Sequence, residues 1–275
     1  MDAGLVTENE RDLPLAGRSI VVTRSAEQAP GLIDPLEALG AEVIVMPVIA
    51  VVEPESWQPV DDAIEHIGEY DWIVLTSVNG VERFEDRMRL RGMRLSELWA
   101  ARVAVVGSAT AKRVRSHGIE PAVVPVSFRA EGLLAEMRRI GPEAGRRVLI
   151  PRAAEAREVL PDELRELGFE VDVVPVYRLE TPEPPPDVLA RLARGDADAV
   201  VFASGGTARR FVEVLHAAGL DETAVLAHTA VASIGPVTTA VLRELGIDVA
   251  IEAAESTASA LVTALAECLT GGASR

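Results

Sequence analysis

Two stretches of the sequence end an apolar run with small polar residues: VLTSVNGVERF at 74–84 and VFASGGTARRF at 201–211. Three more phrases of this kind follow apolar runs, at 23–25, 107–110 and 235–238. Small residues there let a ligand approach the unpaired amides that begin the next helix, where the helix dipole favours anions. Each phrase alone is also typical of an ordinary helix N-cap, whereas the set favours an anion-binding cleft. The residues that these phrases offer to a ligand are Ser77, Asn79, Gly107, Ser108, Thr110, Ser204, Gly205, Gly206, Gly235 and Thr238.

Arginine supplies nearly all of the positive charge, because the chain contains a single lysine, Lys112. A GC-rich genome would explain this bias. Arginine is also the side chain whose planar, two-pronged group pairs best with carboxylates. We expect Arg24, Arg152 and Arg178, which lie at predicted strand ends or just after Pro175, to face the cleft.

Composition excludes several classes of protein. The net charge of −16 argues against nucleic acid or an anionic membrane as the main partner. The longest apolar stretch, residues 43–52, is too short to span a bilayer, and the acidic N-terminus lacks an apolar signal core. We therefore expect a cytoplasmic protein.

The sequence also lacks the usual signatures of cofactor and metal sites. The four histidines are scattered, and no phosphate-binding loop, dinucleotide fingerprint, serine elbow or carboxylate cluster is present. The single cysteine, Cys268, excludes an internal disulfide and is expected to pack as a small hydrophobic residue. An enzyme of this composition would work without cofactor or metal, by positioning and electrostatics.

The chain is an internal duplication. Residues 20–54 align without a gap on residues 148–182, so that Arg24 and Arg152 are 128 positions apart. The two opening stretches follow at a spacing of 127, and residues 106–120 match residues 234–248 at 128 again. Three phrases in the same order indicate two copies of one α/β unit.

Short β-branched runs at 19–24, 71–76, 102–106 and 120–125 are each followed by a segment of helical period. This alternation predicts parallel sheets covered by helices on both faces, as two flavodoxin-like, doubly wound domains. In each copy a proline interrupts the long run after the first helix. We expect each run to form a strand, a joint and a second extended piece, with the extended pieces acting as a hinge.

Five phrases together resemble the uroporphyrinogen-III synthase family: VVTRSAEQAPGLIDPLEALGAEVIVMPVI, LTSVNGVERF, VPVYRLE, SIGPVTTAVLRELGI and ESTASALVTAL. The resemblance implies two α/β lobes joined by a two-stranded β-ladder, with one lobe inserted into the other. The implied lobes are 1–48 with 183–275, and 55–174, and the implied hinge strands are about 48–54 and 175–182.

The resemblance also implies the reaction. The linear octacarboxylate hydroxymethylbilane loses its hydroxyl as water, closes through a spiro intermediate and gives uroporphyrinogen III with ring D inverted. The family's candidate acid maps onto Tyr177, which is otherwise an ordinary aromatic of the hinge strand. Thr238 matches the family's Gly-Pro-x-Thr phrase. The two glycines after Ser204 depart from the family's pattern, which leaves backbone amides for binding there.

The resemblance further implies hand-over of the substrate from hydroxymethylbilane synthase, and nothing in the sequence indicates more than a monomer. A competing interpretation is a non-catalytic, bilobed sensor of tetrapyrroles or other polyanions. A two-lobed glycosyltransferase fits less well, because the chain is short and contains no nucleotide-sugar phrase.

Overall fold

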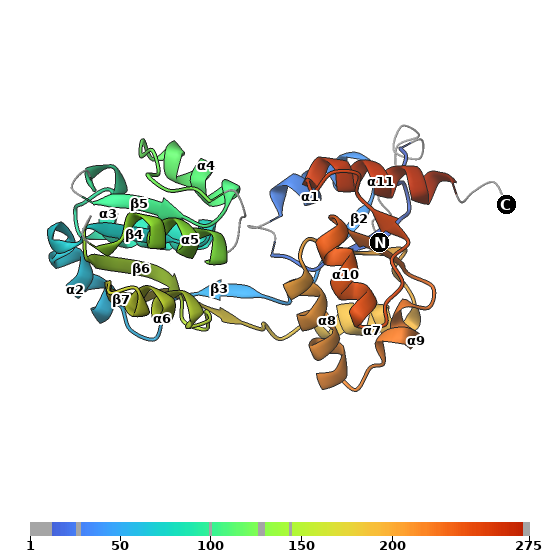
Figure 1. Ribbon diagram of the computed structural model, residues 1–275. Helices are drawn as coiled ribbons and strands as arrows, with labels where there is room; N and C mark the ends of the chain where they lie inside the picture. Colours follow the sequence, from blue (N-terminus) through green and yellow to red (C-terminus); the bar gives the residue numbers. More distant parts are fainter. Residues whose placement is uncertain (1–12, 26–28, 99–100, 126–129, 143–144, 272–275) are drawn as a thin grey trace. The chain divides into compact units, whose positions relative to one another are not determined.

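The computed structural model describes residues 13–25, 29–98, 101–125, 130–142 and 145–271. The chain divides into two units, and Figure 1 shows the helices and strands of each. Unit 1 comprises Met1–Ala50 with Thr181–Arg275, and unit 2 comprises Val51–Glu180. The chain therefore passes between the units twice.

Unit 1 contains a five-stranded sheet in which every neighbouring pair of strands is parallel. The strand order, β10-β9-β8-β1-β2, is the doubly wound order of flavodoxin-like domains. The strands are β1 (Ser19–Val22), β2 (Glu42–Val45), β8 (Ala199–Phe202), β9 (Ala230–Ser233) and β10 (Ile251–Glu252).

Helices cover both faces of this sheet, because successive residues of a strand point to opposite faces. Ile20 and Val22 pack with α1 and α11 in one core, whereas Val21 belongs to the core on the other face, with α7 to α10. The helices are α1 (Pro30–Ala38), α7 (Pro186–Arg194), α8 (Gly205–Ala217), α9 (Glu222–Leu226), α10 (Pro236–Glu244) and α11 (Ala258–Gly271).

Unit 2 contains a second five-stranded sheet with the order β3-β7-β6-β4-β5, in which β7, β6, β4 and β5 are parallel. Its strands are β3 (Ala50–Val52), β4 (Trp72–Leu75), β5 (Arg102–Val105), β6 (Arg147–Ala153) and β7 (Glu170–Glu180). One core lies under α2 (Gln58–Glu65), α3 (Val78–Leu90) and α4 (Ser108–Ser116), and the other under α5 (Ala130–Ile140) and α6 (Val159–Glu166). Short 3₁₀ helices occupy Ile67–Glu69 and Leu95–Glu97.

The prediction of two flavodoxin-like parallel-sheet domains is confirmed. The duplication is visible in the topology, because β1, β2, β8 and β9 of unit 1 hold the places of β6, β7, β4 and β5 in unit 2. Phe84 and Phe211, at matching positions of the two opening stretches, are both fully buried in the cores that contain α3 and α8.

The prediction of a strand at 120–125 is wrong. The only ladder contact of this segment in the described part of the chain is a single parallel bridge between Ala104 and Val123. Pro121 and Pro125 flank this bridge, and proline has no N–H to donate to a ladder. The segment lies beside β5 but cannot extend the pairing.

The prediction that a joint interrupts the chain at Pro175 is also wrong, because β7 is one continuous strand from Glu170 to Glu180. Arg152 of β6 pairs with Pro175, and the next residue, Ala153, pairs with Tyr177. Val176 is therefore the extra residue of a β-bulge, which is a position where a strand accommodates proline. In the first copy, Pro47 does lie between two strands, β2 and β3.

A third prediction is corrected at Cys268, which lies in α11 with its side chain exposed instead of packed.

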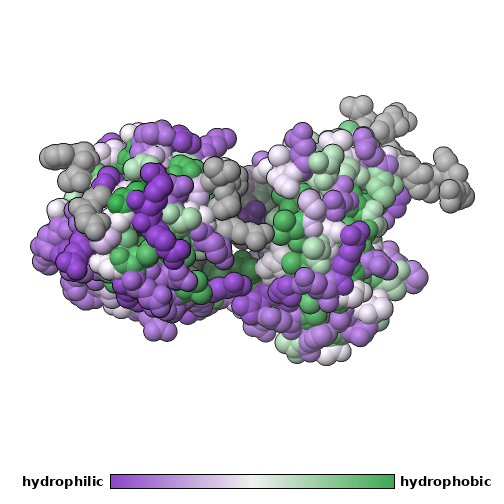
Figure 2. Space-filling model, viewed as in Figure 1, coloured by the Kyte–Doolittle hydropathy of each residue, from purple (hydrophilic) through white to green (hydrophobic). Residues whose placement is uncertain are grey.

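Among the described residues, no helix has the length and apolar composition needed to cross a membrane. Hydrophilic residues cover much of the surface of both units in the view of Figure 2.

Candidate functional site

The carboxyl edge of the unit 2 sheet carries the first group of predicted residues. Ser77 follows β4 and caps α3, where its Oγ accepts the amide of Gly80 at 3.0 Å. Gly107 follows β5 and occupies the N-cap of α4, where no side chain accepts an amide. The first amides of α4, those of Ser108 and Ala109, therefore have no intrahelical acceptor, and no side chain in the described part of the chain accepts them.

Tyr177 lies at the carboxyl end of β7, one residue after the bulge. Its side chain is 6% exposed and belongs to the core under α2, α3 and α4. Its hydroxyl lies 3.1 Å from the Oγ of Ser77, so strand β7 and the first turn of α3 meet at these two hydroxyls. The phenol is thus held at the sheet edge by packing and by one hydrogen bond.

Arg152 is buried in β6, with 3% of its surface exposed. Its guanidinium donates to the carbonyls of Arg157 at 2.7 Å and Ala156 at 3.1 Å, and it pairs with Glu158. These contacts hold the loop between β6 and α6. The guanidinium donors of Arg152, which we expected to face a ligand, are therefore mostly used within the protein.

Arg178 lies one residue beyond Tyr177 and is partly exposed. Its Nε donates to the carbonyl of Glu53 at 3.0 Å, and its guanidinium pairs with Glu180. Among the other predicted residues of this edge, Asn79 is partly exposed, Ser108 is exposed and Thr110 is buried.

The carboxyl edge of the unit 1 sheet carries the second group. Ser204 follows β8 and caps α8, where its Oγ accepts the amide of Thr207 at 3.2 Å. Gly205 and Gly206 begin α8, and Gly206 is exposed. The first two amides of α8 therefore lie at the edge without a side-chain acceptor in the ranges that the structure describes.

The Gly235-Pro236-Val237-Thr238 phrase begins α10 after β9. A Cβ at Gly235 would lie 2.4 Å from the Oγ of Ser256, so a side chain there would force the Ser256 hydroxyl to turn away. Thr238 is 4% exposed, whereas Val237 is 78% exposed. Val237 and Ser256 also lie at this edge and were not among the residues predicted from the sequence.

Arg24 follows β1 at the same edge and is partly buried. Burial lowers the pKa of its guanidinium below the ordinary value. No ion pair joins Arg24 to another residue of the described ranges, so no described carboxylate offsets this loss of hydration. A carboxylate of a ligand would do so.

The predicted residues thus form one group at the carboxyl edge of each sheet. Unit 2 holds Ser77, Asn79, Gly107, Ser108, Thr110, Arg152, Tyr177 and Arg178, and unit 1 holds Arg24, Ser204, Gly205, Gly206, Gly235 and Thr238. Within the described ranges, no group of three or more histidine, cysteine, aspartate or glutamate residues could hold a metal ion.

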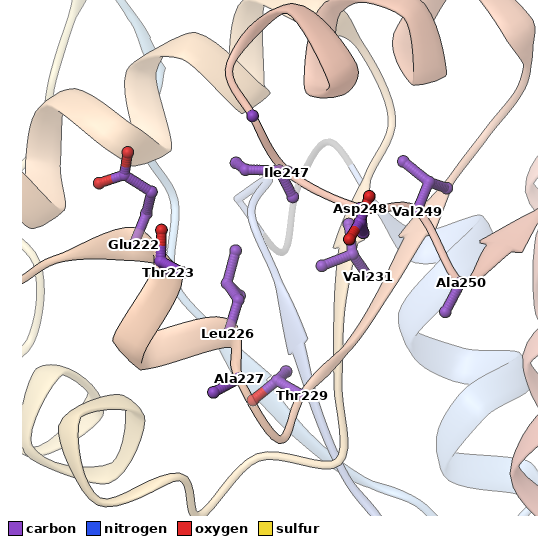
Figure 3. A pocket seen from close by; sticks show the side chains of 11 residues that line it. Glu222, Thr223, Leu226, Ala227, Thr229, Val231, Ile247, Asp248, Val249 and Ala250 are labelled. Atoms are coloured by element: carbon purple, nitrogen blue, oxygen red, sulfur yellow. The ribbon is translucent and has the colours of Figure 1, made fainter.

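A hollow of about 350 Å³ opens at the opposite, amino edge of the unit 1 sheet, between α9 and the segment that precedes β10 (Figure 3). Its lining includes Leu226, Ile247 and the carboxylates of Glu222 and Asp248. None of the predicted site residues lines it, and its charge is unsuited to an anionic ligand.

Known proteins are similar to this chain over most of its length. The family model of uroporphyrinogen-III synthase HemD matches residues 31–263. The chain is 35% identical over 255 residues to the uroporphyrinogen-III synthase of Synechococcus elongatus, covering 92% of this chain and 96% of that protein. It is 27% identical over 257 residues to the uroporphyrinogen-III synthase of Chlorobaculum parvum, covering 92% and 99%.

Solved structures share the fold. A mutant uroporphyrinogen III synthase of Thermus thermophilus matches with a TM-score of 0.66 at 18% identity, over 92% of this chain and 99% of that chain. The enzyme of Helicobacter pylori matches with a TM-score of 0.56 at 19% identity, over the same shares. From the family model and the sequence relatives, the chain belongs to the uroporphyrinogen-III synthase family.

Proposed function

We propose that this chain converts hydroxymethylbilane to uroporphyrinogen III with loss of water and inversion of ring D through a spiro intermediate. Its family is one of hydro-lyases of tetrapyrrole biosynthesis. The observation that carries the proposal is the position of Tyr177. A phenol is held at the carboxyl edge of the unit 2 sheet, beside the first turn of α3, where an anionic substrate is expected to bind.

The two sheet edges supply donors for a substrate that carries many carboxylates. The first amides of α4 and α8 have no side-chain acceptor among the described residues, and the guanidinium of Arg24 is desolvated without a described partner. A hydrogen bond to a charged group contributes about 1.5–3 kcal/mol. Several such bonds hold the substrate, while the negative charge elsewhere on the protein is screened beyond about 8 Å at physiological salt.

Tyr177 is the proposed acid. Its phenol donates a proton to the departing hydroxyl of the substrate, so that water leaves and a cationic azafulvene remains. A neutral phenol carries the proton that this step requires. The chain then closes on the substituted carbon of the last ring, and the spiro intermediate fragments and recloses.

We further propose that the two units act as lobes, with boundaries near 1–48 with 183–275, and 55–174, and with hinge segments near 48–54 and 175–182. Separate cores in each unit support this division.

We also propose a cytoplasmic monomer that receives its substrate from hydroxymethylbilane synthase. Size-exclusion chromatography with light scattering, with and without that synthase, tests the monomer and the hand-over.

The activity is tested by feeding the protein hydroxymethylbilane that its synthase generates in place, and separating the porphyrin isomers after oxidation. Without a cyclase the bilane closes to the symmetric type I isomer. We expect type III to predominate. Type I alone, with the protein folded, would contradict the proposed activity and favour a non-catalytic tetrapyrrole sensor.

A further inference from the structure

The hydroxyl of Ser77 lies between the N-terminus of α3 and the phenol of Tyr177. Its Oγ accepts the amide of Gly80 at 3.0 Å and lies 3.1 Å from the phenol oxygen. We propose that Ser77 is a positioning residue that donates its hydroxyl proton to the oxygen of Tyr177 and thereby supports proton transfer to the substrate. This inference rests on the proposed function, in which Tyr177 is the acid.

Either hydroxyl can donate in this contact, and Ser77 is the proposed donor. A serine hydroxyl has one proton and two lone pairs, and an amide N–H can only donate. The amide of Gly80 therefore occupies a lone pair of Ser77 and leaves its proton free for Tyr177. With Ser77 as donor, the proton of the phenol is not used inside the protein and can be directed to a substrate.

The same contact matters most after the proton has moved. The O–H bond of Tyr177 breaks as a new O–H bond forms on the leaving hydroxyl. The carbon–oxygen bond then breaks with its electron pair leaving on water, and the pyrrole nitrogen stabilises the carbocation. A phenolate remains at a side chain that is 6% exposed. A hydrogen bond to an ionised oxygen is about twice as strong as a neutral one, so Ser77 stabilises the phenolate. The proton released when the last pyrrole ring regains its aromaticity after the final ring closure restores the phenol.

The duplication provides a matched comparison within the same chain. Ser204 lies 127 positions after Ser77 and caps α8 in the same way. The position that matches Tyr177, 128 positions earlier, is Ile49, which has no hydroxyl. Both serines are helix caps, but only Ser77 has a phenol as its second partner. The role of Ser77 as a helix cap can therefore be separated from its role as a partner of the phenol.

A double-mutant cycle tests the proposal. We expect Ser77→Ala to lower kcat for type III formation about tenfold when Tyr177 is present, and to have little effect in a Tyr177→Phe background. Ser77→Thr keeps a hydroxyl and should retain most of the rate. Ser204→Ala is the control for loss of a helix cap, and its effect on kcat should be the same in both backgrounds.

A spectroscopic measurement reports the contact directly. The chain contains two tyrosines, so Tyr70→Phe leaves Tyr177 as the single source of a phenol Cζ resonance in ¹³C NMR. Ser77→Ala should shift this resonance, whereas Ser204→Ala should not. A helix cap that did not contact the phenol would leave the resonance unchanged.

The outcomes separate this inference from the proposed function. If Tyr177→Phe leaves the rate of type III formation unchanged, the roles of both Tyr177 and Ser77 are overturned. If Tyr177→Phe slows the reaction but Ser77→Ala costs the same in either background, or leaves the Cζ resonance in place, Tyr177 remains the acid and the role of Ser77 is overturned.

Discussion

Gly205 and Gly206 are adjacent in sequence but differ in what surrounds them. A Cβ at Gly205 would lie 2.7 Å from a methyl carbon of Val241, so α8 and α10 approach each other closely at this glycine. A Cβ at Gly206 would lie 3.7 Å from Ser204 and 4.0 Å from Ile49, which are ordinary contacts. Helix packing therefore accounts for the first glycine of this phrase, which departs from the family's pattern.

We expect Gly205→Ala to lower the free energy of unfolding by about 1–3 kcal/mol, as overpacking does in a well-packed core. Gly206→Ala is the matched control and should be neutral or stabilising by about 0.5–1 kcal/mol, because alanine favours a helix over glycine. Urea unfolding of both variants measures the difference. Equal effects would contradict the packing explanation.

Arg24 and Arg152 occupy matching positions of the duplication but have different surroundings. Arg152 is buried and bound to the carbonyls of its own loop, whereas Arg24 is partly buried and has no described ion-pair partner. The sequence predicts a binding role for both. The structure supports a structural role for Arg152 and a binding role for Arg24.

We expect Arg24→Gln to raise KM about tenfold, which corresponds to roughly 1.4 kcal/mol, and we expect this effect to shrink at high salt. Arg152→Ala should instead lower the free energy of unfolding by about 1–3 kcal/mol, because it removes a buried side chain and its hydrogen bonds to the carbonyls of Ala156 and Arg157. Steady-state kinetics across a salt series and urea unfolding distinguish the two. A salt-dependent rise in KM for Arg152→Ala, with stability unchanged, would restore its predicted role in binding.

Single residues were predictable from the sequence where the local chain decides their role. Ser77 and Ser204 cap helices because a serine followed by a helical segment supplies the acceptor itself. The surroundings of Arg152 were not predictable in this way. They depend on which carbonyls the loop after β6 turns inward, and no residue pattern encodes that turn.

At the scale of elements, an ion pair holds α7 against the amino edge of the unit 1 sheet. Arg191 of α7 binds Glu42 at the start of β2, and Ser19 at the start of β1 also donates to Glu42. The Arg191 guanidinium, followed by the Ser19 hydroxyl, lowers the pKa of Glu42 from 4.5 to about 2. The contact lies away from the predicted site and concerns stability alone.

The pH dependence of the protein's stability follows from the lowered pKa of Glu42. A carboxylate whose pKa is lower in the folded state stabilises the fold above its unfolded pKa, near 4.5, and loses that contribution as the pH falls towards 2. Because the Glu42 side chain is 55% exposed, we expect the contribution to be at most about 1 kcal/mol.

The free energy of unfolding of the wild type should therefore fall more steeply between pH 5 and pH 2 than that of Glu42→Gln. Urea unfolding at each pH measures this. Glu37→Gln removes an exposed carboxylate that has no ion pair among the described residues, and should parallel the wild type. Parallel curves for Glu42→Gln and the wild type would show that the ion pair contributes nothing measurable.

The elements themselves were largely predictable, and the two errors share a cause. Apolar, β-branched runs mark strands whatever their neighbours, which fits β1, β4 and β5. The run at 120–125 looks the same but lies beside β5 with prolines on both sides, so only one bridge forms. At Pro175 the error is the reverse: an interruption was predicted, but a β-bulge accommodates the proline and β7 continues. Proline's effect depends on the partner strand, which the sequence does not specify.

At the scale of the whole molecule, the duplication was the strongest predictor. Matching phrases at spacings of 127 and 128 required two units of one topology, and both sheets have corresponding strands in the same order. Divergence between the copies was visible only as isolated differences, such as Ile49 against Tyr177. Which of these differences concerns chemistry could be judged only once the neighbouring hydroxyl of Ser77 was placed.

Net charge yields the last prediction, because an acidic protein must bind a polyanion. With a net charge of −16, the protein as a whole repels hydroxymethylbilane at long range, while arginine and helix amides attract it locally. Raising the salt from about 10 mM to about 100 mM shortens the Debye length from about 30 Å to about 10 Å. This change weakens the long-range repulsion more than it weakens short contacts in partly buried sites.

We therefore expect kcat/KM to rise over this range of salt concentration, which is the reverse of an enzyme that steers its substrate with positive charge. Initial rates at low substrate concentration measure it. Arg24→Gln should show a steeper rise, because the local attraction that salt weakens has been removed. A fall in kcat/KM with added salt would show that a positive local field extends beyond the sheet edges and outweighs the net charge of the protein.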